Sequence, residues 1–283
     1  MRIMRRRHAC IALAGAAGAL ATGACTRGGA DDGAARESLL IGAAAAMLPL
    51  TRALAQAFVR EPGAPAILVE RGGSLPAYIA ASRGAIDLAA MTRALSDGED
   101  DAGAHNYLIA RDDIGIVAHP ALPVRGLTRA QVRAVCTGEV ANWRVLGGPD
   151  RPVAVYALPR GATARQSAER LVLDGAEFAV DARECADAAA LVAAVAGDPA
   201  GIACVDGHAR AGAGAAAGAV AVLAVDGVHP ARATVLSARY PHTHSFHLLL
   251  HGEPGGARSA FVRFARSAAG QAIVERLGLV AVC

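Results

Sequence analysis

Apolar residues along the chain follow two alternating patterns: short, mostly apolar runs and helix-like spacings of three or four positions. The runs at 39–41, 66–69, 86–91, 114–117 and 153–157 predict strands, and we expect the last of them, between two prolines, to be buried. Between the first two runs, apolar residues recur at every fourth position, at Leu50, Leu54 and Phe58, and predict a helix with one buried face. Strands that alternate with helices form a largely parallel sheet covered by helices, so we predict an α/β fold.

The segment 127–170 carries the densest set of local signals. Thr128 and Gln131 fit a capping box and predict the start of a helix, and Thr163 and Gln166 repeat the same spacing. The second box follows a predicted strand through a glycine-led turn. A turn that leaves a strand and opens a helix presents free backbone N–H groups and the positive end of the helix dipole. We therefore expect this turn to favour an anion.

A similar turn precedes the helix that we predict near residue 74. Gly72 and Gly73 lead into it, Ser74 fits the N-cap position, and Pro76 is tolerated in the first helical turn. We expect this helix to end near Gly84.

The first 24 residues have the pattern of a signal peptide. Arginines precede an apolar run at 9–21, which is too short to span a bilayer as a permanent helix. The residues from Ala21 to Cys25 resemble a lipobox, in which cleavage before Cys25 frees that cysteine for lipid attachment. The alternative is ordinary cleavage, with Cys25 discarded or left as a plain thiol. Residues 25–37 are then a lipid-anchored flexible tether.

Removal of the signal peptide changes the charge of the chain. The full chain carries a net charge of +3, but its first 24 residues hold four arginines and no acidic residue, so the mature chain carries −1. This balance favours no nucleic-acid partner, and 4% aromatic residues argue against stacking on single-stranded nucleic acid. The 54% hydrophobic content suffices for a large core or for two lobes.

Two blocks of motifs carry a resemblance to a known family. The first comprises Leu127-Thr128, the segment from Val135 to Trp143, Gly147-Gly148 and the turn at 161–165, and the second comprises 225–230, Tyr240-Pro241 and 267–271. In order and spacing they resemble the phosphate-binding proteins of bacterial phosphate ABC transporters, over roughly residues 38–282. The resemblance implies a two-lobed type II periplasmic-binding-protein fold of the α/β class, with a ligand cleft between the lobes.

In the resembled fold the chain crosses between the lobes twice. The resemblance implies a first lobe from 38–115 plus 236–283 and a second lobe from 116–235, which includes the hinge crossings. Ligand is expected in the cleft, where helix N-termini from both lobes converge.

Site residues are carried over one position at a time. The implied ligand-binding residues are Ala43, Ala44, Ser74, Thr92, Arg93, Arg160, Gly161, Ala162, Thr163 and Arg165. Several depart from the family pattern: alanines replace hydroxyl residues in two of the anion loops, and Leu158 stands where the family has an arginine, with Arg160 two positions away. Each charge-assisted hydrogen bond contributes about 1.5–3 kcal/mol, so losing several hydroxyl donors could cost several orders of magnitude in affinity.

Each of these residues also has a structural interpretation. Ser74 and Thr163 can cap their own helices, and Arg93 and Arg165 can be solvated or can pair with Asp87 or with Glu169. Asp87 itself fits the end of a strand or an ion pair as well as it fits a contact to a phosphate proton.

Four cysteines, at positions 136, 185, 204 and 283, follow the lipobox. The family fold would bring Cys185 and Cys204 near each other, so a disulfide between them and buried free thiols are both open. His242 and His244 have the spacing of two residues on one strand face, but no nearby carboxylate or cysteine completes a metal site, and we expect a return strand with polar edges and no metal. No catalytic or cofactor motif is evident, so we expect neither an enzyme nor a cofactor.

The sequence therefore predicts an exported, monomeric solute-binding lipoprotein on the periplasmic side of the bacterial envelope. It would bind inorganic phosphate or a related oxyanion, deliver it to ABC permease subunits, and contact the membrane through its lipid anchor. The alternative is a degenerate binding-protein fold that acts as a non-transport accessory, scaffold or sensor lipoprotein. The alanines in the anion loops favour the alternative, whereas Ser74, Thr92-Arg93 and the turn at 161–165 favour transport.

Overall fold

The computed structural model describes residues 38–101 and 103–282. The predicted signal peptide at 1–24, the tether at 25–37 and the lipidation site at Cys25 lie outside the described residues. Within the described ranges, no helix is both long enough and apolar enough to cross a membrane.

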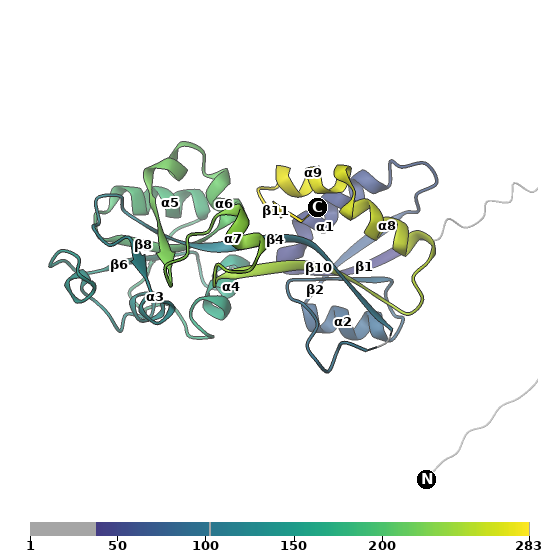
Figure 1. The fold of residues 1–283 in the computed structure, drawn as a ribbon, viewed down its shortest axis with the longest axis horizontal. Coiled ribbons are helices and arrows are strands. Elements are labelled where there is room, and N and C mark those ends of the chain that lie inside the picture. The colour runs from purple at the N-terminus through teal and green to yellow at the C-terminus, as the bar shows by residue number, and fades with distance from the viewer. Residues whose placement is uncertain (1–37, 102, 283) are drawn as a thin grey trace, which may run out of the picture. The chain divides into compact units, whose positions relative to one another are not determined.

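Strands and helices alternate along most of the chain (Figure 1). The strands are β1 (Leu39–Ala44), β2 (Ile67–Gly72), β3 (Leu88–Met91), β4 (Ala104–Ala118), β5 (Gly126–Leu127), β6 (Ala154–Ala157), β7 (Arg183–Glu184), β8 (Gly201–Asp206), β9 (Ala221–Val225), β10 (Thr243–His251) and β11 (Val280–Ala281). The α-helices are α1 (Leu48–Phe58), α2 (Ser74–Ser82), α3 (Arg129–Cys136), α4 (Thr163–Leu171), α5 (Ala188–Gly197), α6 (Gly207–Gly212), α7 (Arg232–Leu236), α8 (Gly256–Arg266) and α9 (Ala268–Arg276). The 3₁₀ helices are η1 (Ala45–Met47), η2 (Trp143–Leu146) and η3 (Gly214–Ala219).

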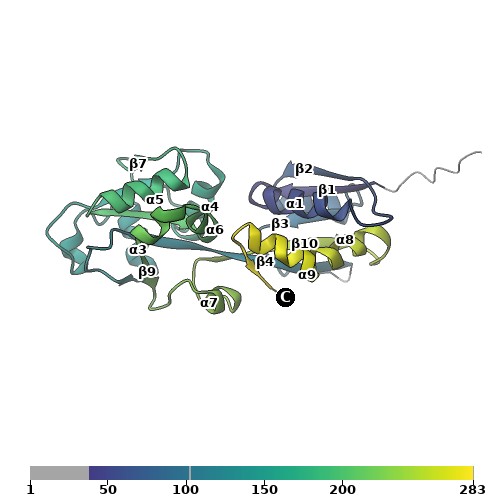
Figure 2. The same cartoon turned by 90° about the horizontal axis from the view of Figure 1, so that it is seen from above.

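The sheet is mixed, and the prediction of a largely parallel sheet holds only for its outer strands. The strand order is β2-β1-β3-β10-β4-β8-β6-β7, and β1 pairs in parallel with β2 and β3, as β6 does with β7 and β8. The long strands β4 and β10 are antiparallel to each other and run between the lobes (Figures 1 and 2). A chain that leaves one lobe and later returns to it must cross in opposite directions, which explains the antiparallel centre.

The sequence predicts only the last part of β4. The strand extends from 104 to 118, but polar residues such as His105 and Asn106 interrupt the apolar pattern before Ile109. The predicted return strand is present as β10, which pairs with β4 from Thr243 to His251.

Each lobe has its own hydrophobic core, as the two-lobed fold requires. One core consists of residues between Ile114 and Tyr240 and includes the fully buried Trp143, whose ring N–H donates to the carbonyl of Ala200 at 2.9 Å. The other joins α1 to α8 and α9, where the rings of Phe58 and Phe261 pack edge to face. Helix α2 covers the opposite face of this sheet (Figure 1). The residue boundaries that we predict for the lobes stay a prediction.

The two predicted capping boxes have different outcomes. Thr128 caps α3 as predicted, because its side chain accepts from the backbone N–H of Gln131 and the Gln131 side chain accepts from the N–H of Thr128. The second box is wrong: α4 begins at Thr163, its N-cap is Ala162, and no side chain caps it. Ser74 is likewise the first residue of α2 and not its N-cap, which is Gly73. The hydroxyls of Ser74 and Thr163 are therefore not used to cap their own helices.

This difference predicts opposite effects on stability at two threonines. Thr128→Ala is expected to lower the free energy of unfolding by about 1 kcal/mol, because the helix loses its N-cap. Thr163→Ala removes no cap and is expected to change stability by less than about 0.5 kcal/mol. Urea unfolding followed by circular dichroism measures both, and equal losses would contradict the assignment of the caps.

The cysteines do not form the pairing that the family resemblance suggested. Cys136, Cys185 and Cys204 are free thiols, so of the two possibilities that the sequence left open the structure has free thiols and no Cys185–Cys204 disulfide. The neighbour of Cys204 is Cys136, at an Sγ–Sγ distance of 3.9 Å inside the core that contains Trp143. Cys185 lies just beyond the short edge strand β7, whereas Cys136 is the last residue of α3.

Candidate functional site

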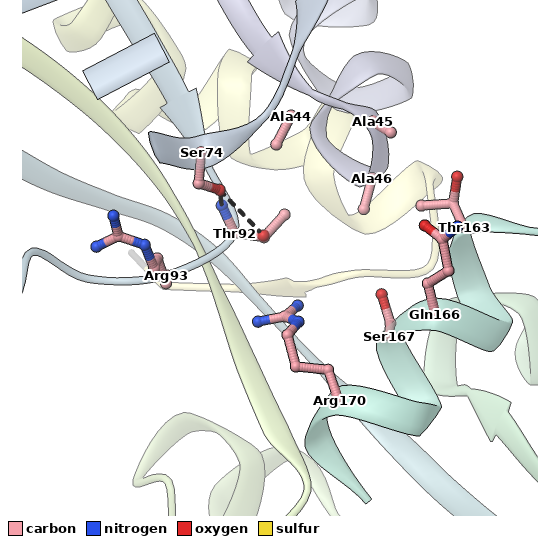
Figure 3. A pocket seen from close by; sticks show the side chains of 10 residues that line it. All are labelled: Ala44, Ala45, Ala46, Ser74, Thr92, Arg93, Thr163, Gln166, Ser167 and Arg170. Atoms are coloured by element: carbon pink, nitrogen blue, oxygen red, sulfur yellow. Dashed lines mark hydrogen bonds between the residues drawn. The ribbon is translucent and has the colours of Figure 1, made fainter. Parts of the chain in front are cut away.

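A pocket of about 370 Å³ opens between the two lobes. The first lobe contributes Ala44, Ala45, Ala46, Ser74, Thr92 and Arg93, and the second contributes Thr163, Gln166, Ser167 and Arg170 (Figure 3). No acidic residue is among these lining residues. The pocket therefore has the location and the charge expected of an anion site.

In the first lobe, two hydroxyls lie side by side at the pocket wall. Ser74 begins α2 and Thr92 follows β3, and the backbone N–H of Thr92 donates to Ser74 Oγ at 3.2 Å. The two hydroxyl oxygens are 3.3 Å apart (Figure 3). Either hydroxyl can donate to a ligand, because neither caps a helix.

In the second lobe, one face of α4 lines the pocket. Thr163, Gln166, Ser167 and Arg170 are spaced three and four residues apart, which places them on the same side of the helix. The Arg170 side chain extends from α4 toward Thr92 (Figure 3). Arg170 is exposed and makes no hydrogen bond or ion pair with any residue that the structure describes.

Arg93 is already paired. Its guanidinium donates to both carboxylate oxygens of Glu99, at 2.5 and 2.7 Å. These hydrogen bonds lower the pKa of Glu99 to about 2, so both groups are charged at neutral pH. The partner offsets part of the charge of Arg93, and Arg170 is the uncompensated cation of the pocket.

Helix N-termini add to the positive potential. Ala44 precedes η1, which continues into α1, and α2 and α4 begin at Ser74 and Thr163. No side chain caps η1, α2 or α4, so no side chain competes with a ligand for their first backbone N–H groups, whereas the Leu48 N–H at the start of α1 already donates to Ala45.

Half of the site residues that the sequence suggests line this pocket. Ala44, Ser74, Thr92, Arg93 and Thr163 do so, and their contact with a ligand stays a prediction.

The others do not line the pocket. Ala43 is fully buried within the first lobe, and Arg160 is exposed and pairs with Glu177 at 3.3 Å. Gly161, at a φ of 85°, forms the turn before α4, and Ala162 is the N-cap of that helix. Both residues belong to the turn before α4, and their contact with a ligand stays a prediction.

Arg165 lies inside the second lobe and not in the pocket lining. Its side chain is 3% exposed and donates to Glu169 at 2.8 Å, to the carbonyl of Leu158 at 2.9 Å and to Glu184 at 3.2 Å. The guanidinium also packs over the Phe178 ring. Pairing with Glu169 was the structural alternative that the sequence allowed.

Asp87 also has a structural partner. Its carboxylate accepts the backbone N–H of Leu40 at 2.8 Å and so holds β1 beside the start of β3. This contact agrees with the interpretation of Asp87 as a strand-end residue.

Sequence reasoning missed Gln166, Ser167 and Arg170. The signal that could have found them was helical periodicity, because these positions follow Thr163 on one face of the predicted helix.

Comparison with known proteins identifies the family. Residues 28–269 match the PBP superfamily domain. The chain belongs to this superfamily. It is similar to the phosphate-binding protein PstS of Bacillus subtilis, with 27% identity over 232 residues that cover 81% of this chain and 75% of that protein.

Solved structures of superfamily members have the same fold. An ABC-type phosphate transport receptor from Vibrio cholerae superposes with a TM-score of 0.77 at 20% identity, over 86% of this chain and 99% of the receptor. A protein from Clostridium perfringens, described as a phosphate ABC transporter substrate-binding protein with bound phosphate, gives a TM-score of 0.62 at 26% identity, over 87% of this chain and 100% of its own length. The superfamily consists of solute-binding proteins and is not an enzyme family.

Proposed function

We propose that this PBP-superfamily chain binds inorganic phosphate in the pocket between its lobes. One observation carries the proposal: uncapped helix N-termini, the Ser74 and Thr92 hydroxyls and the unpaired Arg170 meet in a pocket that no acidic side chain lines. Such donors bind an oxyanion through charge-assisted hydrogen bonds. The PstS relatives and the phosphate-bound structure point to phosphate among the oxyanions.

Backbone donors compensate for the missing hydroxyls. Ala44, Ala45 and Ala46 present no side-chain donor, but their position at the start of η1 leaves N–H groups directed along the helix axis. A substitution by alanine does not remove these groups. We infer an affinity for phosphate that depends strongly on Arg170, because side-chain donors are few.

We further propose that the protein is an exported, monomeric lipoprotein anchored through Cys25 on the periplasmic side of the envelope. Its partners are then the permease subunits of an ABC transporter. The support is the signal-like sequence at 1–24 and the names of its PstS relatives.

Titration calorimetry on two arginine variants tests the proposed site. Arg170→Ala is expected to weaken phosphate binding about 10- to 100-fold, since a charge-assisted hydrogen bond contributes about 1.5–3 kcal/mol. Arg160→Ala is the matched control: it removes the same charge from an exposed ion pair outside the pocket and is expected to leave binding unchanged. Equal losses in both variants, or a loss in Arg160→Ala alone, would contradict the site.

The second candidate function is a non-transport accessory, scaffold or sensor role. The run of alanines at 44–46 and the pairing of Arg93 with Glu99 favour it, because both reduce the donors available to an anion. Wild-type protein that takes up neither phosphate, arsenate nor sulfate at millimolar concentration would support this second function.

A further inference from the structure

A cluster of carboxylates and histidines lies where β4 and β10 pass between the lobes, outside the anion pocket. It consists of Asp112 on β4, Asp206 at the end of β8 and His244 on β10. Each residue offers a ligand atom that lies within 4.8 Å of the ligand atoms of the other two. The sheet fixes part of this arrangement, because His244 pairs directly with Asp112 in the β4–β10 register.

The imidazole of His244 is buried without a hydrogen bond. Its side chain is 4% exposed, and neither ring nitrogen has a hydrogen-bond partner among the described residues. Nε2 points to Asp112 Oδ2 at 3.7 Å, which is too long for a hydrogen bond. A buried imidazole with both nitrogens unsatisfied costs free energy unless a ligand occupies one of them.

The surrounding residues hold the carboxylates in place. His208 Nδ1 lies 2.5 Å from Asp112 Oδ2, and the backbone N–H of His208 donates to Asp112 Oδ1 at 3.2 Å. Arg210 pairs with the neighbouring Asp113 at 3.1 Å. Asp206 is 9% exposed, and its carboxylate accepts no hydrogen bond from a residue that the structure describes. Such outer contacts orient the ligands of metal sites.

The backbone leaves room for the carboxylates but not for another side chain. A Cβ at Gly207 would clash with Asp113 Oδ1 and would lie 2.8 Å from Asp112 Oδ1. Three carboxylates, those of Asp112, Asp113 and Asp206, come together in this region, and Arg210 pairs with only one of them, Asp113. The excess negative charge at a buried position favours a bound cation.

We propose that Asp112, Asp206 and His244 bind a divalent transition-metal ion, with zinc as the best match. Zinc accepts both imidazole nitrogen and carboxylate oxygen in a tetrahedral set, and three protein ligands leave the fourth position to water. Magnesium and calcium prefer sets made of oxygen alone. The ligands come from β4, β8 and β10. The ion would therefore link the two strands that cross between the lobes, β4 and β10, to β8 of the second lobe. This inference does not depend on phosphate binding.

The test uses the purified protein, stripped with a chelator and titrated with zinc chloride in phosphate-free buffer. We expect one zinc per chain with a dissociation constant in the micromolar range or below. Zinc binds the folded state, so saturating zinc is expected to raise the melting temperature by about 5 °C. A wild-type protein that takes up no zinc would overturn the proposal.

Matched variants locate the ion. His244→Gln and Asp206→Asn keep the side-chain size but remove a ligand, and each is expected to abolish both the zinc uptake and the rise in melting temperature. His242→Gln is the control, because His242 directly precedes β10 and its ring contacts the carbonyl of Leu171, and it is expected to bind zinc like the wild type. Cobalt titration adds an absorption spectrum that reports imidazole coordination. Undiminished zinc and cobalt binding in either ligand variant, or a loss only in His242→Gln, would overturn the site.

Discussion

Replacing Arg165 with alanine is expected to lower the free energy of unfolding by about 3 kcal/mol and to leave the phosphate affinity of the folded protein unchanged. The guanidinium is nearly fully buried and joins Glu169, Glu184 and the carbonyl of Leu158. Its removal takes away the donor to the Leu158 carbonyl and to the partly exposed Glu169 and Glu184, and it also removes the packing of the guanidinium over Phe178. Urea unfolding measures the stability, and titration calorimetry measures the affinity.

Arg160→Ala is the control for this experiment. Its ion pair with Glu177 is exposed, so a loss of less than about 0.5 kcal/mol is expected. Arg165→Met separates charge from packing, because methionine retains an apolar stem beside Phe178. A stable Arg165 variant that fails to bind phosphate would show that Arg165 is a ligand contact, as the family resemblance suggested.

His247 is expected to make the protein less stable as the pH falls from about 6.5 to about 4. Burial, followed by the charge of Arg111, lowers the pKa of His247 to about 4 in the folded state, whereas the unfolded chain has the ordinary value of about 6.5. Between these values the unfolded state binds more protons, so the free energy of unfolding decreases as the pH falls. The free energy of unfolding decreases by about 3 kcal/mol in total as the pH falls from about 6.5 to about 4. Above pH 6.5 this group causes no loss of stability.

The difference between wild type and His247→Gln isolates this contribution. The variant cannot take up the proton, so its unfolding free energy is expected to decline less steeply between pH 6.5 and pH 4. His229→Gln, at an exposed position, is expected to follow the wild-type curve. Parallel curves for wild type and His247→Gln, measured by urea unfolding at intervals across this range, would contradict the prediction.

The predictability of the fold differs between its outer and central parts. The apolar runs and the four-residue spacing of Leu50, Leu54 and Phe58 were sufficient for β1, β2, β3, β6 and α1, although β2 has no buried residue, and they gave no sign of β7 or β8. The long crossing strand β4 was only partly predictable. Its first half carries polar residues, and its partner β10 lies more than a hundred residues further along the chain.

The candidate site, like the fold, was only partly predictable from the sequence. The turns that precede Ser74 and Thr163 were predictable from glycine and hydroxyl residues, but the residue that caps each helix was not. The direction in which an arginine side chain points depends on where its hydrogen-bond acceptors lie. Glu184 comes close to Arg165 only because β7 pairs with β6. The cluster around His244 was not predictable either, since the sheet brings its carboxylates from distant parts of the chain.

A crystal structure of the protein grown with phosphate tests the central claim most directly. We expect a phosphate ion between the lobes, within hydrogen-bond distance of the Ser74 and Thr92 hydroxyls, the first backbone N–H groups of α4 and the Arg170 guanidinium. A pocket without phosphate at millimolar concentration, or a phosphate bound to Arg165 or Arg160 instead, would contradict the claim.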